Sequence, residues 1–516
     1  MKPFKLLLIL HIIITSELCG KVHGDACGKQ GLCACDYARH LNVHCDHRNL
    51  TEIPSNIPYD IYKLDLSFNV IEVIPSDSFK GLTLLNQLYI HDNKISMLPG
   101  QLFASLRSLN KFDFSHNELS RIPAKVFSST YELSRLDLSN NSLSVIPEHL
   151  FNSTVQVYTI DLSTNKIRQL SGKFSGRSSR LTQFLIRNNR LVKISGEFFR
   201  TANDLITIDF SSNQLTSVPE GLLDNLTKLT TIDFSYNRIT KIPSSLFNST
   251  YKLLTVYFQN SSMTSLPDDF LINSPNMTYI DLSKNQLTEL PPNLFRDKPH
   301  LTRLQENNLT EIPDNIFNNT PEIYYLSTYS NRLVNISKET IHGLDELTTL
   351  NFGRNNISHI PSDMFIEINL TRTLDLSHNV ISAIPVGLFS NRNRTYNLTI
   401  LFLQKNRIEF IPRNAFDGLY VIQYIFLCDN KIQSLADGAF QRTSVAAIFL
   451  FSNKLSSLEG NPFSNENISE IHLYSNEIQH VSSSVMMGLR NSTTVTLYLS
   501  CQYLSDAPWA SNHVTV

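Results

Sequence analysis

One stretch of sequence recurs along the chain and constrains its fold more than any other feature. In residues 133–156, LSRLDLSNNSLSVIPEHLFNSTVQ, the string L-x-x-L-x-L-x-x-N-x-L is formed by Leu133, Leu136, Leu138, Asn141 and Leu143. These leucines have nothing to pack against within a segment of 24 residues. Such a unit buries its leucines only when it is stacked on copies of itself, which predicts a repeat array.

The asparagine of this string recurs once in each repeat, so its occurrences give the number of repeats. It recurs at Asn69, Asn93, Asn117, Asn141, Asn165, Asn189, Asn213, Asn237, Asn285, Asn307, Asn331, Asn355, Asn379, Asn406, Asn430, Asn453 and Asn476. Ser261 replaces the asparagine in one repeat, and Gln502 replaces it in a last, degenerate repeat. The chain therefore has 18 clear repeats and one doubtful repeat. A buried Asn amide both donates and accepts hydrogen bonds, so we expect it to bind the backbone of adjacent turns, with Ser261 doing part of that work.

A second series follows the first by ten residues. It is mostly phenylalanine, as in Phe79, Phe103 and Phe127, and other apolar residues fill the remaining slots. Aromatic rings at one fixed place in every repeat predict a stacked core rather than a binding site.

The string and its period resemble the extracellular leucine-rich repeat proteins of the 24-residue class, which include the acid-labile subunit, the Slit proteins and the Toll-type ectodomains. The resemblance covers residues 27 to 502 and implies an α/β solenoid. It implies a horseshoe with a parallel β-sheet on the concave face and an irregular or short-helical convex side. We expect a repeat array over residues 59–504.

The N-terminus has the pattern of a secretory signal peptide at residues 1–24. Lys2 and Lys5 precede an apolar run from Leu6 to Ile14. A membrane anchor is disfavoured because this run is shorter than the roughly 20 residues that a span needs. No other stretch is apolar enough to span a bilayer, so we expect a secreted or extracellular chain, or a cell-surface one if the natural chain is longer.

Four cysteines cluster behind this segment, at Cys27, Cys33, Cys35 and Cys45. Two disulfides are favoured over a zinc site, because the spacing lacks the paired C-x2-C of zinc ribbons. Residues 27–58 resemble the N-terminal cap of the same family, and this resemblance implies the pairs Cys27–Cys35 and Cys33–Cys45. Val43 and Cys45 fall where a repeat places inward residues, so we expect the cap to supply the first strand.

The pattern is interrupted in three places. Around residues 301–309 two residues are missing, as we interpret the spacing, from the strand itself, and residues 390–396 carry an insertion of three. Residues 505–516 include Ala507-Pro508-Trp509, similar to the opening of the family's C-terminal cap, but no Cys follows. We therefore expect a truncated or absent cap and a longer natural gene product.

Catalytic chemistry finds no support in the sequence. The zinc-protease, nucleophile-elbow, phosphate-loop and dinucleotide motifs do not occur, and the histidines have no metal spacing. We predict no catalytic residue, no cofactor, no metal site and no enzyme. The net charge of −2 also disfavours a general nucleic-acid binder, so none is expected as a partner.

A binding role is the remaining prediction. Side chains alternate along a strand, so positions 3, 5, 7 and 8 of the string are expected to point out of the concave sheet. Position 5 is mostly acidic in the first half: Asp65, Tyr89, Asp113, Asp137, Asp161, Leu185, Asp209, Asp233, Tyr257 and Asp281. Unspecialised family members share this L-D-L-S pattern, which favours a structural reading of the Asp residues.

The second half differs in character. Aromatic residues take position 5 or 7 at Phe402, Phe426, Phe449, Phe451, His472, Tyr474 and Tyr498. An exposed aromatic patch is typical of a protein interface, so we predict that these residues bind an extracellular protein ligand. The alternatives are an error in the repeat frame and a surface that a C-terminal cap covers.

Two isolated cysteines, Cys428 and Cys501, fall at positions 7 and 8 and are expected to be exposed. Pairing with another chain, in a homodimer or with a disulfide-linked partner, and an absent partner cysteine both remain open.

Sixteen N-x-S/T sequons follow the signal segment and predict a glycoprotein: Asn49, Asn140, Asn152, Asn225, Asn248, Asn260, Asn276, Asn308, Asn318, Asn335, Asn356, Asn369, Asn393, Asn397, Asn467 and Asn491. Asn140 and Asn260 occupy position 8, where a glycan would obstruct the concave face. The aromatic half has no sequon in such a slot. Three roles fit these observations: a secreted or surface recognition protein, a receptor ectodomain, including innate immune types, or a matrix or adhesion component.

Overall fold

The computed structural model describes the repeat array and most of the cap. The described residues are 26–27, 32–37, 39–174, 180–295, 298, 301–320, 322–366, 368, 372–390, 397–464, 468–489, 495–498 and 514–515. The expected signal peptide, the insertion after Ser390, Cys501 and Trp509 lie outside them. Contacts divide the chain into two compact units, Met1–Tyr257 and Phe258–Val516, which we call unit 1 and unit 2.

Unit 1 is a stack of short parallel strands. They are β2 (Leu41–His44), β3 (Ile61–Asp65), β4 (Gln87–Tyr89), β5 (Lys111–Asp113), β6 (Arg135–Asp137), β7 (Thr159–Asp161), β9 (Gln183–Leu185), β11 (Thr207–Asp209), β12 (Thr231–Asp233) and β13 (Thr255–Tyr257). Each pairs with the next, and the register repeats without slippage from β3 onward, as in Lys111↔Arg135 and Arg135↔Thr159. One antiparallel strand, β1 (Ala34–Tyr37), pairs with β2.

Unit 2 continues the same construction. Its parallel strands are β14 (Tyr279–Asp281), β15 (Leu301–Arg303), β16 (Tyr325–Ser327), β17 (Thr349–Asn351), β18 (Thr373–Asp375), β19 (Ile400–Phe402), β21 (Val421–Phe426), β23 (Ser444–Phe449), β25 (Ile468–His472), β27 (Val495–Tyr498) and β28 (Val514–Thr515). The strands β21 and β23 have six residues each, twice the usual three. Longer strands widen the sheet in these repeats.

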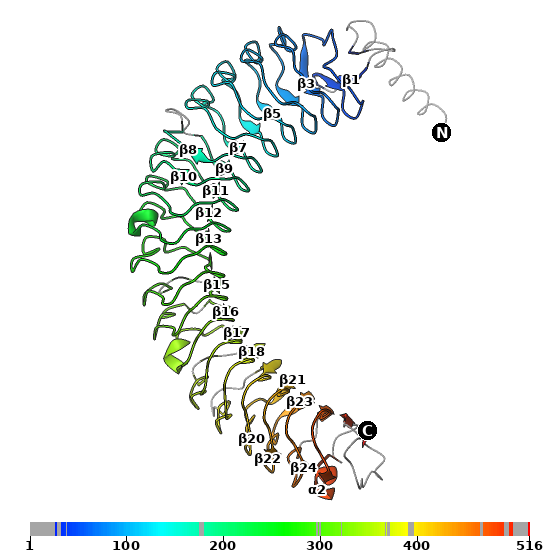
Figure 1. Cartoon of the computed structure of the whole chain (residues 1–516), viewed down its shortest axis with the longest axis vertical. Helices are drawn as coiled ribbons and strands as arrows, with labels where there is room; N and C mark the ends of the chain where they lie inside the picture. The colour runs from blue at the N-terminus through cyan, green and yellow to red at the C-terminus, as the bar shows by residue number, and fades with distance from the viewer. Residues whose placement is uncertain are drawn as a thin grey trace, which may run out of the picture. The chain divides into compact units, whose positions relative to one another are not determined.

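The opposite side of each repeat is mostly turn. In each unit the long sheet lines the inner side of the stacked turns, and the outer side carries short elements (Figure 1). These are the strands β8 (Gln169–Leu170), β10 (Lys193–Ile194), β20 (Phe410–Ile411), β22 (Ser434–Leu435), β24 (Ser457–Leu458) and β26 (His480–Val481), the 3-10 turns η1 (Ser244–Phe247) and η2 (Lys338–Thr340), and the helix α2 (Ser483–Gly488). The predicted parallel-sheet solenoid is confirmed.

The asparagine ladder ties consecutive turns together, as predicted. The Asn213 amide donates to the carbonyl of Ile186 in the preceding repeat at 3.0 Å and to its own Phe210 and Ser211 carbonyls. Its oxygen accepts the backbone N–H of Leu191 at 2.9 Å. The same bonds form at Asn307 and Asn406, where the repeat length changes, so the ladder absorbs both irregularities.

Position 8, just before each asparagine, adopts a left-handed backbone. Its φ lies between 52° and 58° in the repeats from Phe68 to Ser475, although none of these residues is glycine. This conformation costs a non-glycine residue roughly 1–2 kcal/mol. The ladder bonds on either side hold it in place, so the side chains of position 8 form a regular row along the end of the sheet.

The predicted aromatic core is confirmed. Phe103 and Phe127 are fully buried and stack at 5.8 Å, and Phe416 and Phe440 do so at 5.1 Å. Leu223, Leu271, Ile341 and Met486 fill the same slot elsewhere and are also buried. Each buried apolar side chain contributes roughly 1.5–3 kcal/mol, so this column and the leucines stabilise the stack together.

The N-terminal cap closes the exposed end of unit 1. Disulfides join Cys27 to Cys35 and Cys33 to Cys45, the pairing that the resemblance implies. Val43 and Cys45 are buried, and β2 pairs with β3, so the cap supplies the first parallel strand. The cap thus covers a layer of apolar side chains that would otherwise face water.

Two expectations about the frame were wrong. The strand at residues 301–303 is intact and pairs in register with both neighbours, so the missing residues lie before it. Leu304 therefore takes position 6, and Thr302, which is buried, takes the inward position 4. Ser261 does not share the work of the ladder: its buried hydroxyl has no hydrogen-bond partner among the described residues, because the side chain is too short.

Replacing Asn213 with Ala should lower the free energy of unfolding by about 2–4 kcal/mol. The change leaves the Leu191 N–H and the Ile186 carbonyl buried without partners, at roughly 1–3 kcal/mol each. The midpoint of guanidinium unfolding measures the effect. Thr216→Ala, at an exposed site of the same repeat, is the control, and an equal shift in both variants would contradict the role of the ladder.

Candidate ligand-binding face

The open face of the sheet, opposite the apolar core, carries the side chains of position 5. In unit 1 these are mostly aspartates, and several of them accept hydrogen bonds from the serine two residues further along the chain. Asp113 accepts hydrogen bonds from the Ser115 hydroxyl at 2.7 Å and from its backbone N–H at 3.0 Å. Asp65 and Asp209 bind Ser67 and Ser211 in the same way. These bonds fix the end of each strand, which supports the structural interpretation of the Asp column.

The pKa values of two of these aspartates, Asp65 and Asp137, are shifted in opposite directions. At Asp65, burial alone would raise the pKa, but the Ser67 hydrogen bonds and the Lys63 ammonium lower it below the ordinary value. At Asp137, burial together with the neighbouring carboxylates of Asp113 and Asp161 raises the pKa despite hydrogen bonds from Ser139. At Asp137 the neighbouring like charges therefore add to the cost that burial places on the charged form.

In unit 2 the same column becomes a continuous stack of rings, which we call the aromatic ladder. It consists of Phe402, Phe426, Phe449, His472 and Tyr498. The centroids are 5.0, 4.4, 4.5 and 4.2 Å apart in that order, with interplanar angles of 18°, 5°, 17° and 7°. The separations follow the strand spacing of about 4.8 Å, so the parallel register itself places one ring on the next.

Three further residues accompany the ladder. Phe451 and Tyr474, at position 7, stack at 4.6 Å and 7°. Tyr424, at position 3, lies 6.2 Å from Phe426 and 6.3 Å from Phe449 and is 38% exposed. The sequence prediction omitted Tyr424, although its place one position ahead of the inward Ile425 could have identified it.

The ladder is neither core nor fully open surface. Phe402, Phe426 and Phe449 are half-buried, whereas Tyr498 is 41% exposed. The His472 ring lies 3.0 Å from the Glu470 carboxylate through Nε2. Because the ring faces contact one another, the rings present mainly their edges to solvent. The predicted binding residues are thus gathered on one face of adjacent repeats.

Cys428 corrects the expectation for position 7. It is buried at 5% exposure, and its thiol is free. Small residues at this position are buried elsewhere too, as at Ser67 and Ser235. Small side chains at this position are therefore buried, whereas longer ones, such as Arg187 and the rings of Phe451 and Tyr474, reach solvent. A disulfide from Cys428 to a partner or a second copy is therefore disfavoured.

The sequons are distributed unevenly over the described residues. Most of those described are exposed, and Asn140 and Asn260 occupy the left-handed position 8 beside the open face. Asn369, Asn393, Asn467 and Asn491 lie outside the described residues. Between Phe402 and Tyr498 no described sequon occupies an open-face position.

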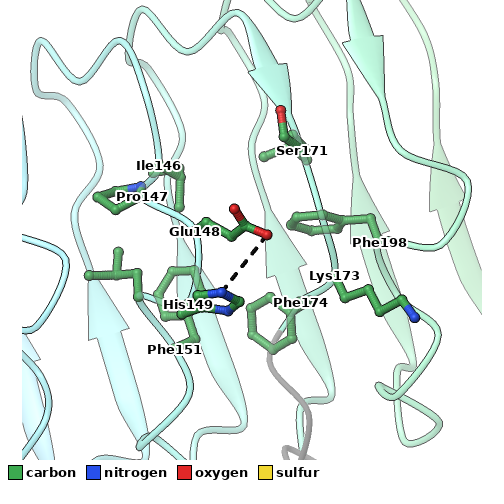
Figure 2. A pocket seen from close by; sticks show the side chains of 11 residues that line it. Ile146, Pro147, Glu148, His149, Phe151, Ser171, Lys173, Phe174 and Phe198 are labelled. Carbon is green, nitrogen blue, oxygen red and sulfur yellow. Dashed lines mark ion pairs between the residues drawn. The ribbon is translucent and has the colours of Figure 1, made fainter.

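A pocket between outer turns of unit 1 is too small to bind a ligand. Figure 2 shows its lining, which comes from residues 146–151 and from Leu170, Ser171, Lys173, Phe174 and Phe198. It encloses about 20 Å³, which is room for about one water molecule. The Glu148–His149 ion pair at its rim spans 3.9 Å between solvent-exposed groups. This gap reflects imperfect packing around Phe174.

One group of potential metal ligands occurs among the described residues, near the cap. Ligand atoms of His44, Asp46 and Asp65 lie within 4.8 Å of one another. Asp65 already contacts the Lys63 ammonium at 3.2 Å, and His44 contacts Asp36 at 2.9 Å. Two of the three groups thus already have a partner within the chain, Asp65 in Lys63 and His44 in Asp36.

Comparison with known proteins defines the class. The family described as "Leucine rich repeat" matches residues 60–119, 84–143, 179–239, 252–305, 321–381 and 396–455, more than half of the chain. The chain belongs to the leucine-rich repeat family. Within the described residues no helix has the length and apolar character needed to cross a membrane.

Individual relatives are similar over short segments. Chondroadherin-like protein of Mus musculus is 34% identical over 82 residues, 16% of this chain and 11% of the relative. Leucine-rich repeat-containing protein 3 of Danio rerio is 38% identical over 82 residues, 16% of this chain and 30% of the relative. The matched part is less than a third of either relative's own length.

A solved structure extends the likeness in fold. The structure of the Toll–Spatzle complex, described as a molecular hub in Drosophila development and innate immunity, superposes with a TM-score of 0.57 at 17% identity. The superposition covers 85% of this chain and 77% of that one. At this identity the likeness concerns the fold alone.

Thiol labelling should distinguish the buried Cys428 from an exposed residue. Burial, with a smaller contribution from Asp429, raises the pKa of its thiol to about 11. Alkylation by iodoacetamide at pH 8 should therefore leave Cys428 unmodified in the native chain and modify it fully in guanidinium. Peptide mapping by mass spectrometry reads this one site, and rapid native labelling would contradict the burial.

Proposed function

We propose that the chain is an extracellular recognition protein that binds a protein ligand through the open face of unit 2. The aromatic ladder is the contact surface, and Phe426 and Phe449 lie at its centre. The observation that carries the proposal is the stack itself: five adjacent repeats replace the structural Asp of position 5 with a ring. Aromatic residues supply much of the binding energy at protein interfaces, because they bury large areas at low cost in conformational entropy.

The alternative interpretations of the ladder are less well supported. A core role does not require rings at position 5, because the leucines and the Phe column already fill the interior. A frame error is disfavoured by the register, which pairs Phe402 with Phe426 and Phe426 with Phe449. The sequons favour the same face, since those at position 8 lie in the repeats of Asp137 and Tyr257 rather than beside the ladder.

The extracellular location rests on three features. These are the signal-peptide pattern of residues 1–24, the disulfide-bonded cap and the number of sequons. A secreted or surface recognition protein accounts for them most directly. A receptor ectodomain is the second candidate, and it is favoured by the likeness in fold to the Toll–Spatzle complex. A matrix or adhesion component is the third, because one relative is a chondroadherin-like protein.

A glycan placed beside the ladder should abolish binding. The pair Ser475→Asn with Glu477→Thr creates a sequon at position 8 of the His472 repeat, in the same backbone conformation as Asn140. The probe is a set of peptides selected from a random phage-displayed library on the secreted wild-type chain. Affinity should fall at least about 100-fold, since a branched glycan excludes a ligand from neighbouring repeats.

The matched control is the same sequon in unit 1. Ser212→Asn with Gln214→Thr also places Asn at a left-handed position 8, and peptide binding should persist. Phe426→Ser with Phe449→Ser should remove binding without unfolding the array, whereas Tyr89→Ser, at position 5 in unit 1, should not. Binding that survives the ladder variants, or a library that yields no binder, would refute the proposal.

A further inference from the structure

A row of cations begins two repeats before the aromatic ladder and continues through the ladder repeats. Arg354 and Lys405 occupy position 8, and Arg407, Lys431 and Lys454 directly follow the ladder asparagines of three consecutive repeats. All five side chains are exposed. We call these five residues the basic row.

The basic row forms no direct ion pairs among the described residues. Among the described residues, no carboxylate lies within 4.0 Å of any of its five cationic groups. Arg354 instead lies over the Tyr329 ring, 5.8 Å from its centroid. Asp429 and Glu409 are the nearby acidic residues in sequence, and neither forms an ion pair with the row.

The row and the ladder lie close enough to act on one ligand. His378 occupies position 8 between Arg354 and Lys405. Burial lowers its pKa, and the charges of Lys405 and Arg354 lower it further against the opposing effect of Asp375 and Asp429. Asp375 is the position-5 residue that pairs in register with Phe402. Lys405 and Arg407 belong to the same repeat as Phe402, the first ring of the ladder, so the row and the ladder occupy the same repeats.

The geometry of the rings restricts the class of ligand. Sugars and nucleobases bind aromatic residues by stacking on the ring face. Here the faces of Phe426, Phe449 and His472 are occupied by their neighbours in the stack, at 4.2 to 5.0 Å. Ring edges suit apolar side chains better, so an anionic polysaccharide or nucleic acid would leave the ladder unused.

We infer that the ligand of this face is an acidic polypeptide segment, whose apolar side chains contact the ladder while its carboxylates contact the basic row. This inference rests on the proposed function and adds the chemistry of the partner. Basic residues also follow the asparagine in unit 1, at Lys94, Lys166, Arg190 and Arg238, and position 5 of those repeats is Tyr89, Asp161, Leu185 and Asp233. Only the aromatic half combines a ring at position 5 with a basic residue after the asparagine in three consecutive repeats.

A charge-reversal experiment tests the inference with a matched control. Arg407→Glu, Lys431→Glu and Lys454→Glu are combined in one chain, and Lys166→Glu, Arg190→Glu and Arg238→Glu in another, at the same position of the repeat. The probes are peptides of about 12 residues, enough to span the row, from the random library. Selected peptides should be rich in Asp and Glu, and the first variant should weaken their binding roughly tenfold or more.

Salt and competing polyanions complete the test. Binding of the acidic peptides should weaken as ionic strength rises in the wild type, lose that dependence in the first variant and keep it in the second. Selected peptides without acidic excess, or equal effects of both variants, would overturn the inference. So would tighter binding of a heparin oligosaccharide or a single-stranded oligonucleotide than of the peptides.

The two proposals fail in different ways. If Phe426→Ser with Phe449→Ser removes peptide binding but charge reversal and salt do not change it, the ladder binds a ligand and the acidic chemistry is wrong. If the Phe variants bind as the wild type does, the proposed function itself is wrong.

Discussion

The hydrogen bonds of the buried asparagines are the interaction on which the rest of the structure depends. Each amide joins the backbone of its own turn to that of the preceding one, as Asn213 does with Ile186 and Leu191. Because these bonds form where each strand ends, they set the spacing of the strands and hold position 8 in its left-handed conformation. Repeats of different length are accommodated elsewhere, so the sheet keeps its register through Asn307 and Asn406.

That fixed register decides what the open face can display. Residues at one position of the repeat lie one strand spacing apart, which is close to the stacking distance of aromatic rings. Aspartates in such a column repel one another. The pKa of Asp137 is raised, first by burial and then by the charges of its neighbours, Asp113 and Asp161. Rings in the same column attract one another. The change from Asp375 to Phe402 therefore replaces a structural column with the stack of rings that we propose as the contact surface.

The fold could be predicted from the sequence because each repeat contains the residues that mark its own strand and its own part of the core. The asparagine period located the strands, and the Phe period located the core, both independently of tertiary detail. The prediction failed where a residue's environment depends on the next repeat. Cys428 has the same position as Phe451, yet it is buried because a small side chain fits against the adjacent strand. The strand at Leu301 was misplaced because two leucines fitted the string in two frames, and only pairing with Tyr279 and Tyr325 decides between them.

The candidate site was predicted in part for the same reason. The frame identified the ladder residues one by one, but their stacking, the inclusion of Tyr424 and the unpaired basic row are properties of neighbouring repeats. The average repeat around Leu133 explains the architecture, whereas the departures from it between Phe402 and Tyr498 carry the function that we propose.

Photo-crosslinking tests this account most directly. A library-selected peptide carrying a benzophenone side chain would be irradiated with the secreted chain, and the crosslinked residues identified by mass spectrometry. The account predicts crosslinks on β19, β21, β23 and β25, close to Phe426 and Phe449. Crosslinks concentrated on the aspartate strands β5 to β12 would contradict it.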